Sequence, residues 1–254
     1  MTRTSFVAVC AALLSLAASP PTARTWIGQE TAIEGHLRTA RVTRLEDIGT
    51  GVTRPRRAFL DPAAPCGSLA WKVIPPGRRG GYQESYKSEI AAYELDKLLG
   101  LRMVPPAVER EIDGETGAAV MWLDGVRSVK QTGGRVPSSA VWGRDARRMQ
   151  MFDNLIGNID RNAGNILLGE PGELILIDHS RAFVTNNRLP HAFERVDAAL
   201  WDRMTALTRA DLAGAVGAWV DGGAIDAMLR RRERMRAQVD KLVAEHGRER
   251  VLIR

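Results

Sequence analysis

The spacing of apolar residues divides the chain into a strand-rich first half and a helix-rich second half. In the first half, short runs of apolar and β-branched residues alternate with glycine and proline turns. Runs of this kind are typical of antiparallel strands. We predict strands at residues 56–60, 68–74, 108–112 and 118–123, preceded by a strand that runs into a glycine turn over residues 44–53.

One long helix interrupts the predicted strands, over residues 85–99. Its apolar positions recur at helical spacing, and Gly100 provides a natural C-terminal stop. The glycine-rich stretch 77–81 just before it is predicted to be a loop. Residues 19–30 are predicted to form an exposed linker.

The second half is predicted to be mainly helical. A first helix ends near Gly157, where Phe152, Leu155 and Ile156 would share one face. Thr208 and Asp211 have the spacing of a capping box at the start of a later helix. Further helices are predicted over residues 195–206, 209–219 and 224–246.

The order of the predicted elements, with strands first and helices later, favours an α+β protein with two lobes. We expect a β-rich, nucleotide-binding first lobe with one main helix at residues 31–125, and a helical second lobe at 126–254. Residues 124–143 would connect them. The net charge of +6 includes the arginine-rich run 230–236. We interpret that run as a solvated helix face and expect no nucleic-acid partner.

The N-terminus has the pattern of a secretory signal peptide. Arg3 precedes the apolar run 6–18, which ends in small residues and two prolines. We therefore predict a signal peptide at residues 1–19, export to the periplasm or the extracellular space, and no transmembrane segment after cleavage. The alternatives are an uncleaved membrane anchor, or a cytoplasmic protein whose start is misassigned. Cleavage would leave Cys66 as the only cysteine, so no intramolecular disulfide could form.

The most informative motif is a set of three polar residues around a predicted hairpin. Asp160 is followed by Asn165, and Asp178 ends an apolar run after two short predicted strands, 166–168 and 174–177. Such a hairpin would bring Asn165 and Asp178 to one edge, and their oxygens suit Mg²⁺. Phosphoryl transfer needs two metal ligands of this kind and a carboxylate near the attacking hydroxyl.

Lys72 is the main candidate in the first half. A strand lysine usually faces solvent, but one followed by a glutamate-bearing helix can contact nucleotide phosphates and be held by that glutamate. Glu89 is the proposed partner, with Glu94 on the same helix and Glu84 just before it as rivals.

A turn between the first two predicted strands contains Gly49 and Gly51, whose backbone amides could approach phosphates; a plain hairpin turn is the alternative. The sequence has no P-loop motif, no zinc-binding His-Glu-x-x-His and no Gly-x-Ser-x-Gly elbow. His179, beside Asp178, is interpreted first as a local turn residue.

Together these residues resemble the atypical kinases of the secretory pathway: the Golgi casein kinase, its xylosyl-kinase relative and four-jointed, with their bacterial relatives. Residues 86–106 resemble the regulatory helix of that group and the Val-Pro-Pro that follows it. Residues 158–161 resemble its catalytic loop and residues 177–183 its metal-binding turn. Phosphoinositide-kinase-like and HipA-type kinases share parts of this pattern.

The resemblance implies a protein-kinase-like fold that uses ATP with Mg²⁺ or Mn²⁺. Asp160 would orient or deprotonate the acceptor hydroxyl, and Asn165 and Asp178 would bind the metal. The remaining implied contacts are to the nucleotide: Lys72, Glu89, Gly49 and Gly51 at the phosphates, and Met121, Trp122 and Leu123 as the hinge against adenine.

The predicted function is transfer of the γ-phosphate to a hydroxyl of a protein, a glycan or a lipid head group. Related loops often read Asp-Arg-His, whereas this chain has Asn162 in the histidine place. The alternative is therefore a weak or inactive pseudokinase that acts as a nucleotide-binding or scaffolding module.

Overall fold

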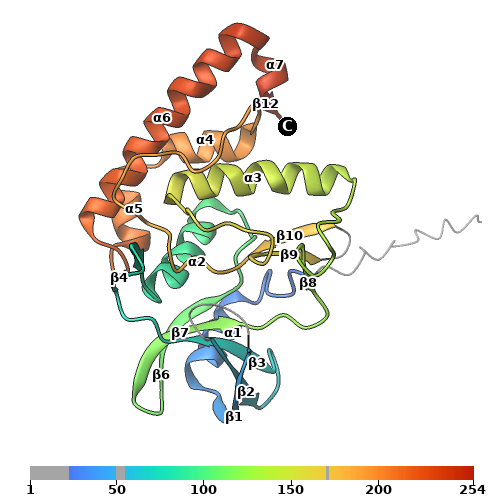
Figure 1. Ribbon diagram of the computed structural model, residues 1–254, viewed down its shortest axis with the longest axis vertical. Helices are drawn as coiled ribbons and strands as arrows, with labels where there is room; N and C mark the ends of the chain where they lie inside the picture. Colours follow the sequence, from blue (N-terminus) through green and yellow to red (C-terminus); the bar gives the residue numbers. More distant parts are fainter. Residues whose placement is uncertain (1–22, 50–54, 170–171) are drawn as a thin grey trace, which may run out of the picture.

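The computed structural model describes residues 23–49, 55–169 and 172–254 (Figure 1). An antiparallel sheet forms one lobe and a set of helices forms the other, which confirms the predicted α+β, two-lobed, protein-kinase-like fold. The lobe boundaries given above stay predictions. The proposed signal peptide, residues 1–19, lies outside the described residues. Among the described residues, no helix combines the length and apolar character needed to cross a membrane.

The first lobe contains a five-stranded sheet in the order β1-β2-β3-β7-β6, with every neighbouring pair antiparallel. The strands are β1 (Arg41–Asp47), β2 (Arg56–Asp61), β3 (Ser68–Lys72), β6 (Ala107–Ile112) and β7 (Glu115–Met121). Strand β3 is central and almost wholly buried. The five predicted strands are confirmed with shifted ends; residues 50–53 of the first predicted segment lie outside the described residues.

Strands β3 and β7 approach each other closely behind Lys72. The Cα atoms of Lys72 and Ala118 are partners in the ladder. A Cβ atom added to Gly117 would lie 2.4 Å from the Lys72 carbonyl oxygen. Glycine is therefore required at this position, because any side chain would push β7 away from the strand that carries the lysine.

The main helix of this lobe, α2 (Lys87–Leu99), was predicted, and Gly100 ends it in the left-handed conformation with φ 58°. Near its end the buried carboxylate of Asp96 accepts hydrogen bonds from the backbone amides of Arg102, Met103 and Val104. These bonds fix the chain that leads from α2 into β6. Burial raises the pKa of Asp96 to about 7, in spite of those bonds.

The stretch 77–81 is not the predicted loop. It belongs to a two-stranded hairpin, β4 (Gly77–Arg79) and β5 (Tyr82–Glu84), which leads directly into α2. Gly80 and Gly81 have φ values of 54° and 86°, and so they supply the positive φ angles that a tight hairpin turn requires. The glycines that suggested a loop are the turn of this hairpin.

A second helix in this lobe, α1 (Glu30–Thr39), was not predicted, and the described part of residues 19–30 is no exposed linker. Trp26 is buried with the Ile33 and Leu37 face of α1 against the sheet. Just before it, Arg24 forms a buried ion pair with Asp145 and donates to the Leu174 carbonyl at 2.7 Å. Residues 23–29, here called the strap, therefore run from the helical lobe into the sheet lobe.

The described part of the helical lobe contains two small sheets besides its helices, in the orders β10-β9-β8 and β11-β12. Its strands are β8 (Arg127–Ser128), β9 (Ile166–Gly169), β10 (Glu173–Leu176), β11 (Val196–Asp197) and β12 (Leu252–Ile253). Its helices are α3 (Ala140–Ile156), α4 (Ala198–Ala206), α5 (Arg209–Val216), α6 (Gly222–His246) and α7 (Arg248–Val251). Both hydrogen bonds of the predicted Thr208–Asp211 capping box are present at α5. Helix α3 begins inside the stretch predicted to be a connection, because Ser139 caps it.

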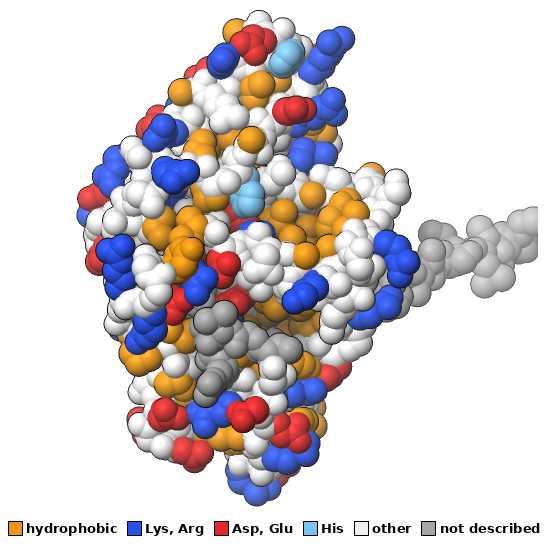
Figure 2. All heavy atoms as spheres, viewed as in Figure 1, with side chains coloured by type: hydrophobic (Ala, Val, Ile, Leu, Met, Phe, Trp, Pro, Cys, Tyr) orange, Lys and Arg blue, Asp and Glu red, His pale blue; other side chains and the backbone are white. Residues whose placement is uncertain are grey.

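The arginine-rich run on α6 is not wholly a solvated face. Arg231 is fully buried, and it donates to the carbonyls of Leu155 at the end of α3 and of Val184. Gly157, which ends α3 with φ 65°, makes room for it, since an added Cβ would lie 2.8 Å from the Arg231 guanidinium carbon. Elsewhere on the face seen in Figure 2, basic and acidic side chains are interspersed.

Candidate active site

The cleft between the lobes contains an ion-paired lysine. Lys72 Nζ at the end of β3 lies 2.6 Å from Glu89 Oε1 on α2 and 3.0 Å from Asp178 Oδ1. Glu89 is thus the partner that the structure selects. Its rivals are engaged elsewhere, Glu94 with Lys97 and Glu84 with Arg181.

Asp178 follows β10 and turns the chain sharply, with φ 61°. A positive φ is uncommon for an aspartate and marks a backbone held by its surroundings. Here the next amide, His179 N–H, donates to Glu89 Oε2 at 3.1 Å. Asp178 Oδ1 accepts from Lys72 and from Ser180 Oγ. Among the described residues, Oδ2 makes no hydrogen bond and remains available to a ligand.

Asp160 lies in the loop between α3 and β9, with its carboxylate partly exposed. The loop is closed on itself: Asn165 Nδ2 donates to the Asp160 carbonyl at 3.0 Å. The Ile177 amide in turn donates to the Asn165 carbonyl at 3.2 Å, which places Asn165 next to the residue before Asp178. The predicted hairpin therefore brings Asn165 and the Asp178 turn together.

Arg161 anchors this loop from inside. Its guanidinium makes two bonds to Asp153 on α3, at 2.9 and 3.0 Å. It also donates to the carbonyls of Asn165 at 2.8 Å and Ile177 at 2.6 Å. Burial by itself would raise the pKa of Asp153, but Arg161 holds it well below its usual range. One arginine thus fixes both the loop of Asp160 and the turn of Asp178, a role that the sequence pattern did not reveal.

His179 is a buried core residue rather than a simple turn residue. Its ring packs edge-on against Phe152, and its Nε2 lies 2.9 Å from Arg161. Because a guanidinium can only donate, Nε2 must be the acceptor, and the ring proton lies on Nδ1 towards Glu89. Burial lowers the pKa of His179, which agrees with a neutral ring.

Asn162, which stands in the histidine place, has a clear local role. Its Oδ1 accepts from the Gly164 amide at 2.9 Å, and its Nδ2 donates to the Asp160 carbonyl at 3.1 Å. An asparagine side chain that bonds its own loop in this way stabilises a tight turn. Asn162 therefore holds the backbone of Asp160 together with Asn165.

The proposed hinge residues lie at the end of β7 and just after it. The amides of Met121 and Trp122 already donate to the carbonyls of Pro106 and Ser68, at 2.8 and 3.1 Å. Within the described residues, the Leu123 amide makes no backbone hydrogen bond. If adenine binds here, Leu123 is the donor that remains for it.

The proposed phosphate turn is only partly described. Gly49 is exposed with φ 69°, which suits a turn that presents backbone amides. Gly51 lies outside the described residues. The Ile48 amide donates to the Pro55 carbonyl at 3.2 Å and closes the base of this turn.

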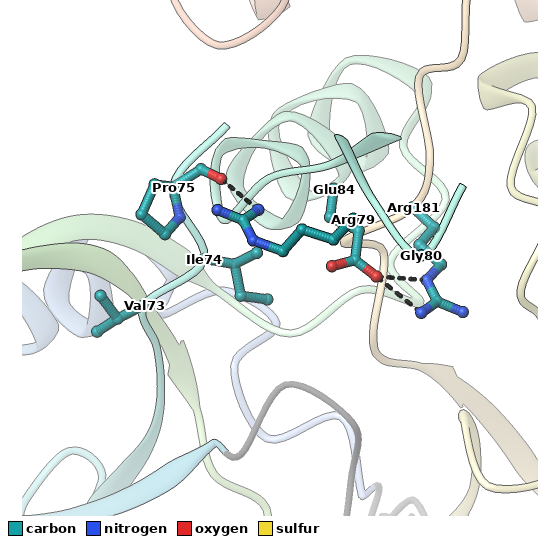
Figure 3. Close-up of a pocket in the computed structure, with 7 residues that line it drawn as sticks. All are labelled: Val73, Ile74, Pro75, Arg79, Gly80, Glu84 and Arg181. Atoms are coloured by element: carbon teal, nitrogen blue, oxygen red, sulfur yellow. Dashed lines mark hydrogen bonds and ion pairs between the residues drawn. The ribbon is translucent and has the colours of Figure 1, made fainter. Parts of the chain in front are cut away.

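A cavity of about 260 Å³ lies at one end of the cleft (Figure 3). Glu84 from the β4–β5 hairpin and Arg181 from the turn after Asp178 point toward one another in it, while Arg79 donates to the Pro75 carbonyl at 2.7 Å. Arg181 also contacts Asp160, 3.3 Å away. Arg181 lies within the predicted metal-binding turn, residues 177–183, but its spacing alone indicated no role for it.

The donor set fits Mg²⁺ or Mn²⁺ only together with phosphate oxygens. Among the described residues, no three His, Cys, Asp or Glu side chains gather to hold a metal. What is available is one carboxylate oxygen of Asp178 and Oδ1 of Asn165, which makes no hydrogen bond to any described residue. Mg²⁺ is commonly held in this way, by one or two protein oxygens plus substrate phosphates.

The sheet with its helix α2, the helical lobe and the lysine–glutamate pair across the cleft define a protein-kinase-like fold. Solved structures agree with this assignment. The structure of hydra Fam20 with sugar has a TM-score of 0.70 at 17% identity, over 89% of this chain and 92% of that chain. The predicted resemblance to the secretory-pathway kinases is therefore confirmed at the level of the fold.

Two further structures extend the comparison. The Golgi casein kinase matches with a TM-score of 0.70 at 14% identity, over 89% of this chain and 79% of that one. Its form with Mn/ADP bound matches with a TM-score of 0.64. The Helicobacter pylori proinflammatory kinase CtkA has a TM-score of 0.52 at 10% identity, over 83% of this chain and 97% of that chain. No protein-family profile and no curated protein sequence matches.

Proposed function

We propose that the protein is a metal-dependent phosphotransferase that moves the γ-phosphate of ATP to a hydroxyl of a protein, a glycan or a lipid head group. The observation that carries the proposal is the position of Lys72, which contacts both Glu89 and Asp178 in the cleft. A kinase site requires this lysine–glutamate pair next to a metal-binding aspartate. The similar Golgi casein kinase structure holds Mn/ADP, which supports the same class of ligand.

Each residue has a physical task in this proposal. Lys72 places a positive charge at the phosphates, and Glu89 keeps that charge aimed into the cleft. Asp160 orients the acceptor hydroxyl and accepts its proton, because its carboxylate is partly exposed on a loop fixed by Arg161. Asn165 and Asp178 hold the metal, which when bound supplies charge neutralisation at the phosphates. Positioning and charge are the main contributions that this reaction needs.

The test is phosphate transfer from ATP with Mg²⁺ or Mn²⁺, scored on protein, glycan and lipid acceptors and on water. The wild type is expected to transfer phosphate. Asp160→Asn should lose about 10²-fold or more of the rate, in the range of general-base removal, and should still bind nucleotide. Asp240→Asn, an exposed aspartate on α6, serves as the matched control. Equal rates for wild type and Asp160→Asn would rule out the role given to Asp160.

A second candidate is a nucleotide-binding pseudokinase, which is favoured by Asn162 in the place of the usual histidine. Under this candidate, ATP with metal raises the melting temperature because it binds only the folded state. No acceptor would be phosphorylated, and Asp160→Asn would leave that shift unchanged. Absence of both a shift and transfer would remove both candidates.

A further inference from the structure

Arg181 joins three separate parts of the cleft through one side chain. It follows Asp178 by three residues, so its backbone belongs to the second lobe. Its Nε and a terminal nitrogen both lie 2.7 Å from Glu84 Oε1, at the end of the β4–β5 hairpin. Its other terminal nitrogen lies 3.3 Å from Asp160 Oδ2. The guanidinium also stacks 4.4 Å from the centre of the Tyr82 ring.

The two carboxylate contacts of Arg181 differ in kind. Glu84 is buried, with a side chain 5% exposed, and its Oε1 accepts from Nε and forms an ion pair with a terminal nitrogen, both at 2.7 Å. Asp160 is 37% exposed and accepts one long bond. A short, desolvated, two-point contact is much stronger than a single solvated one. Arg181 is therefore anchored on Glu84, and its contact with Asp160 is the adjustable one.

The anchor also lies where the two lobes meet. The Ser85 amide donates to the Ser180 carbonyl at 3.0 Å, so the residues next to Glu84 and Arg181 are joined by a backbone bond. The same turn also contacts the lysine–glutamate pair, since Asp178 Oδ1 accepts from Lys72 and the His179 amide donates to Glu89. Any shift of the hairpin relative to the turn must therefore move the guanidinium that touches Asp160.

We propose that Arg181 is a positioning residue that holds the Asp160 carboxylate in place relative to the first lobe, with Glu84 as its anchor. The catalytic consequence rests on the proposed function. Lys72 and the metal ligands bind the nucleotide. Arg181 determines the fraction of time for which the Asp160 carboxylate faces the acceptor hydroxyl. Because misplacement of a reacting group by about 1 Å can cost on the order of 10²-fold in rate, this control acts on the turnover number rather than on affinity for ATP.

The kinetic test compares four variants and one control variant with the wild type. Arg181→Gln is expected to lower kcat by about 10²-fold with KM for ATP within about two-fold, and Arg181→Lys to recover part of the rate. Glu84→Gln should lower kcat as well. The double variant Arg181→Gln/Glu84→Gln should have a kcat no lower than that of Arg181→Gln alone, because each substitution by itself already removes the contact between Arg181 and Glu84. Arg79→Gln, which removes an exposed arginine from the same cavity, is the matched control.

A second readout needs no turnover. Hydrogen–deuterium exchange should rise in peptides covering residues 77–85 and 158–165 together in Arg181→Gln, and in neither for Arg79→Gln. If the wild type transfers no phosphate but this coupled exchange is seen, the proposed function fails and the anchoring role stands. Unchanged exchange at 158–165, wild-type kcat in Arg181→Gln, or additive losses in the double variant would each overturn the proposal.

Discussion

The ammonium of Lys72 lies 2.6 Å from the carboxylate of Glu89, and both side chains are withdrawn from solvent. Burial alone would lower the pKa of Lys72, but Asp178 and Glu89 hold it above its ordinary value. Burial would likewise raise the pKa of Glu89, yet Lys72 holds it well below. The pair therefore stays ionised, and each charge depends on the other.

Lys72→Met is expected to lower the free energy of unfolding by about 3–5 kcal/mol, because it leaves Glu89 as an uncompensated buried charge. The double variant Lys72→Met/Glu89→Leu should recover most of that stability and none of the nucleotide binding. Urea unfolding measures the first effect, and the shift of melting temperature with ATP and Mn²⁺ measures the second. If the double variant bound ATP as the wild type does, Lys72 would have no role at the phosphates.

Arg161→Gln is expected to be among the most damaging changes in the second lobe. It removes the guanidinium that neutralises the buried Asp153, and the two carbonyl contacts that join the Asp160 loop to the Asp178 turn. A loss of about 3–5 kcal/mol in the free energy of unfolding should follow. Arg161→Lys should rescue little, since a lysine cannot reproduce the planar set of donors. A stable, fully active Arg161→Lys protein would contradict this assignment.

The pH dependence of stability should carry a contribution from Asp96. Its pKa in the folded protein, about 7, lies above the ordinary value. The folded state thus binds the proton more tightly, and the contribution is fully present below pH 4 and is lost as pH rises through 7. Relative to Asp96→Asn, the wild type should lose up to roughly 4 kcal/mol over this window. Parallel pH curves for the two proteins, measured by urea unfolding, would disprove it.

Asn162 can be tested by a graded series. Asn162→Asp keeps the acceptor for the Gly164 amide and loses the donor to the Asp160 carbonyl, whereas Asn162→Ala loses both. Phosphate transfer should fall in the order wild type, Asp, Ala, with the alanine variant about 10-fold down for the loss of roughly 1.4 kcal/mol of loop stabilisation. The nucleotide-induced melting shift should stay the same. A reversed order would mean that the asparagine limits catalysis rather than supporting it.

Gly117→Ala should disturb the site by displacing β3, the strand that carries Lys72. Its methyl group would lie 2.4 Å from the Lys72 carbonyl, so β3 and β7 must separate. Overpacking of this kind typically costs about 1–3 kcal/mol, and nucleotide affinity should fall because Lys72 moves with its strand. Gly143→Ala on α3, where the nearest atom lies 3.7 Å away at the tip of Arg147, is the control and should be neutral or stabilising.

The parts of the site that could be predicted depend on local spacing. The hairpin that joins Asn165 to Asp178 and the helix that carries Glu89 both follow from periodicity and turn residues within short stretches. The helix α1 could have been found in the same way, since Ile33 and Leu37 have helical spacing. The buried position of Arg231 falls on the apolar face of α6, between Met228 and Met235, and periodicity could have indicated it too.

The remaining contacts are long-range and leave no local signal. Arg24 meets Asp145, and Arg181 meets Glu84, across gaps of 121 and 97 residues. Nothing in the spacing of charges along the chain selects these partners among many arginines and carboxylates. The role of Arg161 could not be predicted for the same reason. Its guanidinium donates to two backbone carbonyls that come together only when the chain folds.

The strap restricts how the lobes can move. Apart from residues 122–126, it is the described segment that passes from one lobe to the other, and Ile27 and Val126 pack against the same apolar cluster. Figure 1 shows both passages on the side of the molecule away from the β4–β5 hairpin. The lobes also touch beyond these two passages: the Leu176 amide donates to the Met103 carbonyl at 2.8 Å, and α2 packs in one apolar cluster with α3 and α5. The strap therefore adds a second tie at the edge of the molecule where residues 122–126 cross, while α2 rests on the helical lobe between that edge and the hairpin.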